Sequence, residues 1–171
     1  MTDPETAVTL KGKPVTLVGN QVAVGQVAPR FIVIDEDLSP VVSAAFEGKP
    51  CIISSVVSLD TEVCDAEVRR FNQEAAGLSE DMHVLVVSMD LPFAQKRWCG
   101  AAGIDRVTVL SDHRGASFGT AYGVLIKDLR LLARAVFAVD SRGIVRYKEL
   151  VSEITDEPDY AKALEAARQL T

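Results

Sequence analysis

Two continuous apolar runs constrain the fold of this chain more than any other feature. Residues 51–57 (CIISSVV) and 83–89 (HVLVVSM) are rich in β-branched residues, and such runs are typical of strands that are covered on both faces. Between them, apolar residues recur at helical spacing from Val68 to Leu78, with polar residues on the opposite face. We therefore predict a strand, a helix and a second strand, with the first strand near the centre of its sheet.

The remaining segments extend this pattern. In order, the sequence predicts a hairpin over residues 7–18, a strand at 31–34, a helix that opens at Pro92 and ends at Gly100 or Gly103, a strand at 107–110, a short helix around 115–121, a strand at 131–139, a turn at 140–143, a strand at 144–150 and a helix from about Asp159. Together they describe a thioredoxin-like α/β fold, with a central mixed β-sheet flanked by helices and an N-terminal β-hairpin. We expect one domain spanning residues 1–171.

The charge and the apolar content argue against several classes of function. The formal net charge is −6, and the 18 Lys and Arg residues are dispersed, whereas a nucleic-acid partner needs a basic face. No apolar run approaches the length of a membrane span, and residues 1–14 lack the basic start and apolar core of a secretory signal. We expect a cytoplasmic protein that binds neither nucleic acid nor a membrane.

The three cysteines, Cys51, Cys64 and Cys99, are an odd number and do not suggest the disulfide framework of a secreted domain. No Cys-x-x-Cys pair, zinc-binding spacing or glycine-rich phosphate loop is present. His83 begins a predicted strand and His113 lies in a polar turn, so neither shows the arrangement of a cysteine hydrolase. We expect neither a metal ion nor an organic cofactor.

Cys64 has two interpretations. It shares one helical stripe with Val68 and Phe71, which is typical of an inert thiol packed in the core. If Thr61 is the N-cap, however, Cys64 takes the position that glutamate occupies in a capping box. There the free N–H groups and the helix dipole stabilise a thiolate.

A reactive Cys64 also needs a cation from elsewhere in the chain. Like charges disfavour a thiolate, and four acidic residues lie within four positions of it: Asp60, Glu62, Asp65 and Glu67. Arg134 stands inside the otherwise apolar run LLARAVFAV, where an unpaired guanidinium is too costly to bury. It is a candidate partner for Cys64, with a structural ion pair or an edge position as the alternative.

The other two cysteines differ in their surroundings. Cys51 opens an apolar strand, and we expect it to pack in the core. Cys99 follows Trp98 near the glycine-rich end of a predicted helix that can fray. It is either a packed thiol or a second thiol that can reach Cys64.

Four segments of the chain resemble the bacterial thiol peroxidases, the atypical two-cysteine branch of the peroxiredoxin family. They are SLDTEVCDAEVRRFN, MDLPFAQKRWCGAAG, ASFGTAYGV and ARAVFAVD, and the similarity continues to KELVSEITDEPDYAKAL. The resemblance implies a homodimer that reduces hydrogen peroxide and organic hydroperoxides, with thioredoxin as the reductant. It further implies that Cys64 is the peroxidatic cysteine and Cys99 the resolving cysteine of a redox-active intramolecular disulfide, with Thr61 and Arg134 as catalytic partners.

One position departs from the family pattern Pro-x-x-x-Thr-x-x-Cys. Val57 stands where the proline is expected. Proline fixes its own φ and restricts the residue before it, so its loss loosens the loop that shields the thiolate. We expect weakened rather than lost activity.

The resulting hypothesis is a peroxidase cycle in which the segments around Cys64 and Cys99 both shift, because a disulfide needs Cα atoms within about 7 Å. Three alternatives stay open at this point. One is a peroxide-sensing or redox-regulated binding protein with weak turnover. The others are a thiol-dependent hydrolase or transferase, and an inert fold with buried thiols.

Overall fold

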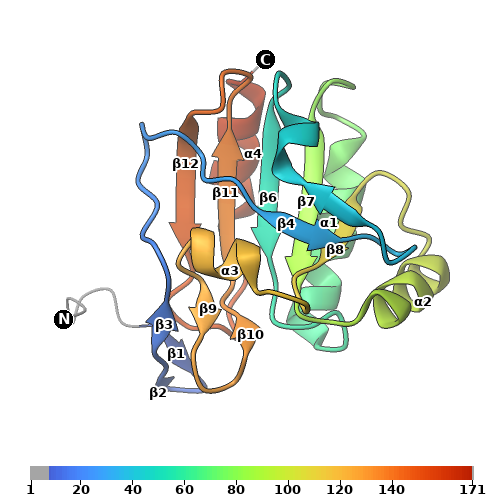
Figure 1. Cartoon of the computed structure of the whole chain (residues 1–171). Coiled ribbons are helices and arrows are strands. Elements are labelled where there is room, and N and C mark those ends of the chain that lie inside the picture. The colour runs from blue at the N-terminus through green and yellow to red at the C-terminus, as the bar shows by residue number, and fades with distance from the viewer. Residues whose placement is uncertain (1–7, 171) are drawn as a thin grey trace.

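The computed structural model describes residues 8–170 (Figure 1). A seven-stranded mixed sheet has the order β12, β11, β6, β7, β8, β4, β5. Its strands are β4 (Ile32–Ile34), β5 (Pro40–Val42), β6 (Cys51–Ser55), β7 (His83–Ser88), β8 (Thr108–Ser111), β11 (Ala135–Val139) and β12 (Val145–Leu150). β6 pairs in parallel with β7 and antiparallel with β11. The predicted interior position of the first apolar run is therefore confirmed.

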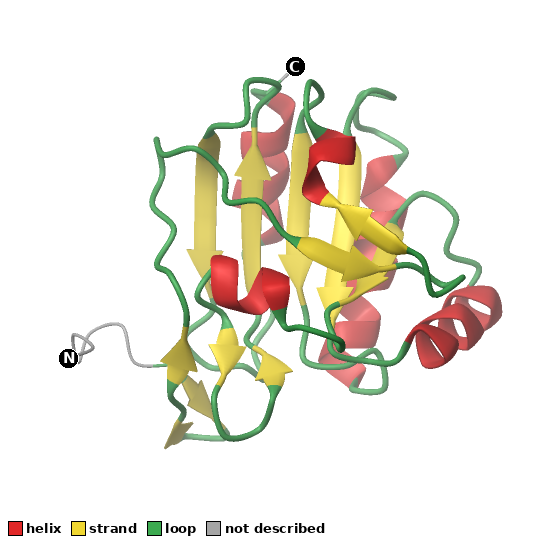
Figure 2. Ribbon diagram, in the orientation of Figure 1, coloured by secondary structure: helices red, strands yellow, loops and turns green. Residues whose placement is uncertain are grey.

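Helices cover both faces of this sheet (Figure 2). They are α1 (Glu62–Ala75), α2 (Pro92–Ala102), α3 (Ser117–Ala121) and α4 (Tyr160–Arg168), with a 3-10 turn η2 (Ser43–Phe46) between β5 and β6. Alternate residues of a strand point to opposite faces. Ile52 of β6 packs in the cluster that contains α1 and α4, whereas Ile53 packs in the cluster around Phe118 of α3. The thioredoxin-like α/β arrangement is thus confirmed, including a mixed sheet with helices on each side.

The N-terminal hairpin is shorter than predicted. β1 (Thr9–Leu10) pairs antiparallel with β2 (Lys13–Pro14). The predicted start of the hairpin at residue 7 lies outside the described residues. The same holds for residues 1–7 of the N-terminal segment in which we expect no secretory signal. β3 (Leu17–Val18) belongs instead to a second small sheet with β9 (Leu125–Ile126) and β10 (Leu131–Leu132). Both small sheets lie below the main sheet in Figure 1.

The prediction of one continuous strand over residues 131–139 is wrong. β10 ends at Leu132 and β11 starts at Ala135, so Ala133 and Arg134 form a break between two sheets. The backbone of this break is hydrogen-bonded outside the main sheet, from Ala133 N to the Val124 carbonyl and from Val151 N to the Arg134 carbonyl. Apolar composition alone could not reveal that the chain changes sheets here.

The helix ends follow local chemistry. Pro92 opens α2, since its missing N–H has no intrahelical partner in the first turn in any case. α2 ends at Ala102 and is capped by Gly103, which takes a left-handed conformation with φ of 68°. α1 ends at Ala75, one turn earlier than Leu78. Within residues 8–170, none of the helices is long and apolar enough to cross a membrane.

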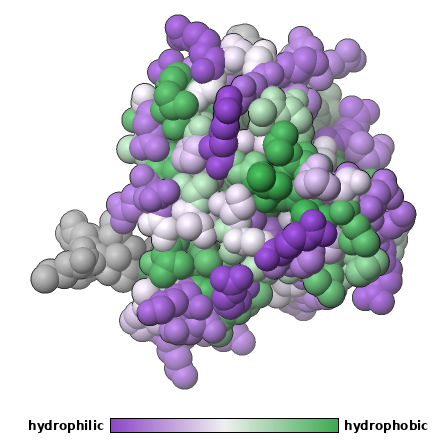
Figure 3. Space-filling model, viewed as in Figure 1, coloured by the Kyte–Doolittle hydropathy of each residue, from purple (hydrophilic) through white to green (hydrophobic). Residues whose placement is uncertain are grey.

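The surface on the side of β4 and β5 mixes polar and apolar side chains. Figure 3 shows apolar colour gathered over these two strands. Ile32 of β4 and Val42 of β5 expose 53% and 47% of their area, respectively. This edge of the sheet therefore presents apolar side chains to solvent.

Candidate active site

Cys64 lies in the first turn of α1, directly after the loop that leaves β6. Thr61 is the N-cap residue, with an extended backbone, so Cys64 is the third residue of the helix. Its side chain is fully buried, together with those of Val68 and Phe71. The thiol thus combines both features of the sequence: it faces the core, and it lies at the positive end of a helix.

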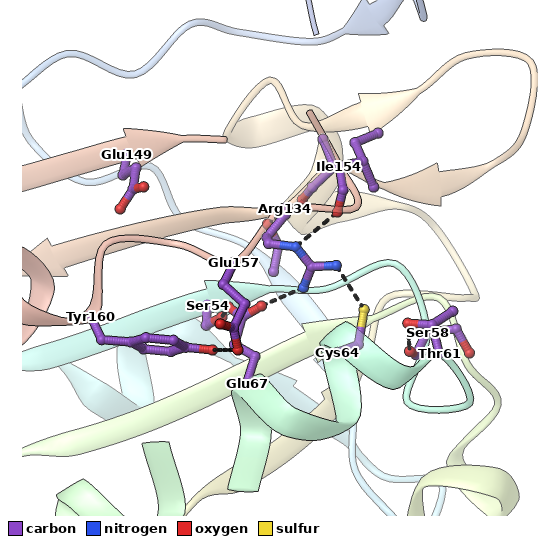
Figure 4. A network of polar contacts seen from close by, with 12 residues as sticks. Ser54, Ser58, Thr61, Cys64, Glu67, Arg134, Glu149, Ile154, Glu157 and Tyr160 are labelled. Carbon is purple, nitrogen blue, oxygen red and sulfur yellow. Dashed lines mark hydrogen bonds and ion pairs between the residues drawn. The ribbon is translucent and has the colours of Figure 1, made fainter. Parts of the chain in front are cut away.

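Arg134 meets Cys64 in this core. Its Nη2 lies 3.3 Å from the Cys64 Sγ, and its Nε donates to the Ile154 carbonyl at 3.0 Å (Figure 4). The arginine is 1% exposed. The break between β10 and β11 turns this side chain toward the helix, so the predicted pairing of Cys64 with Arg134 is present.

Glu67 is the residue of this site that sequence reasoning misjudged. We expected it to disfavour a thiolate, but its carboxylate is fully buried and forms an ion pair with Arg134 Nη1. It also accepts a hydrogen bond from the Ser54 hydroxyl of β6 at 2.7 Å. The helical spacing contained the signal, because Glu67 falls on the same buried stripe as Cys64 and Val68. A carboxylate within such a stripe needs a buried cation.

The electrostatics of this cluster keep the arginine charged. Burial opposes the charge, but Glu67 and Cys64 outweigh it and raise the pKa of Arg134. Burial raises the pKa of the Glu67 carboxyl, while attraction to Arg134 and the hydrogen bond from Ser54 act in the opposite direction. One fixed cation therefore contacts both a thiol and a carboxyl group in a fully buried cluster.

Thr61 is the N-cap as predicted, but it does not form the expected capping box. Its hydroxyl donates to the Ser58 carbonyl at 2.9 Å, and its backbone N–H donates to the same oxygen at 3.1 Å. Within the described chain, neither a capping hydrogen bond from the Thr61 side chain nor a hydrogen bond between Thr61 and Cys64 is present. Thr61 instead closes the tight turn that precedes the cysteine, next to Cys64 in Figure 4.

Cys99 lies in the last turn of α2, where its carbonyl accepts from Gly103 and Ile104. Its thiol is half-buried, whereas the Cys64 thiol is fully buried, and both are free. Burial, together with the nearby Glu36 carboxylate, raises the pKa of Cys99. Its neighbour Trp98 donates from Nε1 to Asp65 of α1 at 2.9 Å. The turn that carries Cys99 is therefore held against the helix of Cys64 through side chains.

Two hollows lie near cysteines. A shallow depression of about 360 Å³ covers the first turn of α1, lined by Leu59, Asp60, Thr61, Glu62, Asp65 and Trp98, but the Cys64 thiol does not line it. A cavity of about 700 Å³ lies beside Cys51, at the start of β6, with Phe31 and Tyr122 in its wall. Cys51 is 5% exposed, and burial raises the pKa of its thiol. Its expected core position is confirmed.

The described side chains around Cys64 do not form a metal site. Within residues 8–170, no group of three or more His, Cys, Asp or Glu side chains is placed to hold a metal ion. The buried cluster consists of a thiol, a carboxylate, a hydroxyl and a guanidinium. Such a set can stabilise negative charge at sulfur or on a neighbouring oxygen.

Comparison with known proteins gives consistent results. Residues 23–164 match the family model described as Redoxin. The chain is 57% identical over 162 residues to the thiol peroxidase of Halalkalibacterium halodurans, covering 95% of this chain and 97% of that protein. It is also 57% identical over 163 residues to the thiol peroxidase of Bacillus subtilis, with the same coverage.

Solved structures agree with the sequence comparison. A peroxiredoxin-like protein from Aquifex aeolicus superposes with a TM-score of 0.91 at 45% identity, covering 97% of this chain and 98% of that one. A thiol peroxidase from Chromobacterium violaceum has a TM-score of 0.85 at 21% identity, covering 99% and 98% of the two chains. The second likeness supports the shared fold alone.

Proposed function

This chain belongs to the redoxin family, as a peroxiredoxin-type thiol peroxidase, and from this premise we propose that Cys64 is the residue that attacks the peroxide. The observation that carries the proposal is the contact of 3.3 Å between Arg134 Nη2 and Cys64 Sγ at the N-terminal turn of α1. A guanidinium and a helix N-terminus both favour the thiolate form of a cysteine.

In the first step, the Cys64 thiolate attacks one oxygen of the hydroperoxide and the O–O bond breaks. Cys64 becomes a sulfenic acid, and the other oxygen takes up a proton and leaves as water or an alcohol. Arg134 and the N–H groups of the first helical turn stabilise the charge that develops on the oxygens. Thr61 contributes its hydroxyl after it exchanges the Ser58 carbonyl for the substrate.

In the second step, the Cys99 thiol attacks the sulfenic sulfur. Water leaves, and a disulfide joins Cys64 to Cys99. Both segments must move for this bond to form, because Cys64 is fully buried and Trp98, next to Cys99, is hydrogen-bonded to α1. A dithiol of the thioredoxin type then reopens the disulfide by exchange, which restores both thiols.

The substrate range and the assembly are part of the proposal. We expect reduction of hydrogen peroxide and of organic hydroperoxides in the cytoplasm, with thioredoxin as the electron donor. We also expect a homodimer. Apolar side chains at the start of α2 offer contact surface for a second copy, since Leu91 and Phe93 expose 52% and 64% of their area.

Mass spectrometry after one equivalent of hydrogen peroxide tests this cycle. The expected product has lost two hydrogens, and a peptide map places the bond between Cys64 and Cys99. Protein that stays unmodified contradicts the proposal. A stable sulfenic acid on Cys64 without a disulfide contradicts only the role of Cys99 and leaves the role of Cys64 intact.

A peroxide-sensing or redox-regulated binding protein is the second candidate. It is favoured by Val57 at the proline position and by the complete burial of Cys64, whose thiol lines neither of the two hollows described above. Steady-state peroxide consumption with thioredoxin, thioredoxin reductase and NADPH separates the two functions. Continuous turnover supports the peroxidase, whereas a single stoichiometric oxidation supports the sensor.

A further inference from the structure

Asp90 follows β7 and lies opposite the turn that precedes Cys64. Its Oδ1 accepts from the Ser58 hydroxyl at 2.7 Å, and its Oδ2 accepts from the Leu59 backbone N–H at 2.9 Å. Oδ2 also accepts from the Ser88 hydroxyl at 2.7 Å. One carboxylate therefore bridges the end of β7 and the loop between β6 and α1.

The hydrogen bonds continue from this loop to the helix of Cys64. The Ser58 carbonyl accepts from both the hydroxyl and the N–H of Thr61, and the Thr61 carbonyl accepts the first backbone bond of α1, from Asp65 N at 2.9 Å. Val57, at the start of this loop, does not restrict its own φ as a proline would. The conformation of residues 58–61 thus depends on side-chain hydrogen bonds, and Asp90 supplies two of the acceptors.

In the other direction the network reaches α2. Gln95 of α2 is 1% exposed. Its Nε2 donates to the Ser88 hydroxyl at 3.1 Å and to the Leu110 carbonyl at 2.9 Å. Cys99 stands one helical turn after Gln95, on the same helix. Ser88 therefore connects α2, which carries Cys99, to the Asp90 carboxylate, which is hydrogen-bonded to the turn before Cys64.

We propose that Asp90 is a positioning residue for the peroxide reaction, holding the turn of residues 58–61 in the reactive conformation and linking that turn to α2. The proposal rests on the function proposed above for Cys64 and adds a residue that does not touch the substrate. Displacement of α2 pulls on Ser88 and Asp90, so the turn before Cys64 and the helix of Cys99 loosen together. The reactive conformation is restored when α2 returns.

The sign of the effect separates positioning from simple electrostatics. Removing a negative charge near Cys64 favours its thiolate, so an electrostatic role predicts faster alkylation and faster reaction with peroxide. Loss of positioning instead predicts that the two rates change in opposite directions. A loosened turn exposes the buried thiol to iodoacetamide, whereas peroxide reduction needs aligned donors and slows.

The test compares Asp90→Ala with Asp90→Asn, in which the amide can still bridge Ser58 and Leu59 through its oxygen and nitrogen. Two second-order rates are measured on the reduced full chain, one with hydrogen peroxide and one with iodoacetamide. We expect Asp90→Ala to react with peroxide at least about tenfold more slowly and with iodoacetamide faster. Asp90→Asn should recover most of the peroxide rate. Asp128→Asn, which changes an exposed carboxylate in the loop between β9 and β10, is the matched control and should stay within about twofold of wild type.

Hydrogen exchange adds a readout of the link to α2. In the wild type, residues 58–64 and the last turn of α2 should lose protection together on oxidation. In reduced Asp90→Ala, residues 58–64 should already be unprotected while α2 stays protected. If Asp90→Ala does not fold, Ser58→Ala removes one bond of the same bridge and should shift both rates in the same directions.

Three results would overturn the positioning role. They are a peroxide rate of folded Asp90→Ala equal to that of wild type, a parallel rise of both rates, and a parallel fall of both rates. A wild-type protein whose Cys64 does not react with peroxide at all would instead refute the proposed function itself. The two failures are therefore distinguishable.

Discussion

The guanidinium of Arg134 lies 3.3 Å from the Cys64 sulfur and at the same time forms an ion pair with the buried Glu67 carboxylate. Both partners come from α1, three residues apart, whereas Arg134 comes from the break between β10 and β11. The carboxylate fixes one edge of the guanidinium and leaves another for sulfur. An arginine held in this way needs little reorganisation when charge develops at the thiol.

Replacement of Arg134 by lysine should strongly impair the peroxide reaction. A lysine ammonium cannot contact Cys64, Glu67 and the Ile154 carbonyl in the planar geometry of a guanidinium. We expect the second-order rate of Cys64 oxidation by hydrogen peroxide to fall about 100-fold, the scale for loss of one oriented donor. Stopped-flow measurement on single turnovers gives this rate. A change below about threefold would show that the contact does not activate the thiol.

A double variant serves as the control for this ion pair. Arg134→Met alone leaves Glu67 buried without a cation and should destabilise the fold by roughly 3 kcal/mol. Combining it with Glu67→Leu removes the unpaired charge, so most of the stability should return in urea unfolding while the peroxide rate stays low. If the double variant recovered both the stability and the peroxide rate, the ion pair would have a structural role only.

Trp98 should report the movement of Cys99. It is the single tryptophan of the chain, with its Nε1 bonded to Asp65 and the Arg69 guanidinium 5.6 Å from its ring. Peroxide should change its fluorescence in two phases, the second with disulfide formation, and Cys99→Ser should lack that second phase. Cys51→Ser, an alteration of a core thiol, should keep both phases. A second phase that persists in Cys99→Ser would contradict the predicted disulfide.

Val57→Pro should stabilise the loop before Cys64. Within residues 8–170, we find no hydrogen bond donated by the Val57 N–H, so proline removes no partner from the fold. A compatible proline typically adds about 0.4–1 kcal/mol through the unfolded state. The melting temperature should rise, and the peroxide rate should increase because the turn of residues 58–61 is held more firmly. A slower variant would show that valine contributes apolar cover that proline cannot replace.

The N-terminal hairpin should loosen in acid. Backbone N–H groups of Thr155 and Gly12 donate to the Glu153 carboxylate and hold its pKa at about 2, below the ordinary value of 4.5. A carboxyl whose pKa is lower in the folded state than in the unfolded state stabilises the fold at any pH above its ordinary pKa. This contribution is lost as the pH falls toward the pKa of the folded state. The stability difference between wild type and Glu153→Gln should therefore shrink between pH 4.5 and about 2. Thermal melts across this range measure it, and a constant difference would contradict the assignment.

Much of the fold could be read from local pattern. The apolar runs at 51–57 and 83–89 predicted β6 and β7, because continuous β-branched residues are stable only where both strand faces are covered. Pro92 and Asp159 marked helix starts through their backbone chemistry, and Asp159 indeed caps α4. The small strands β3, β9 and β10 were not recognised as a separate sheet, because two-residue strands have too few residues to show a period.

The sequence by itself determined that Cys64 lies on a buried helical stripe at a helix start, and that Arg134, if it is buried, needs a partner. Both follow from periodicity and from the cost of desolvating a charge. Only the tertiary structure decided which charges meet. It showed that Glu67 pairs with Arg134 instead of opposing the thiolate, and that the Asp90 carboxylate accepts hydrogen bonds from Ser58 and Leu59 in the preceding turn. Such pairings join residues from separate elements. The periodicity of side chains within one helix or strand shows which face is buried, but not which residue of another element lies against that face.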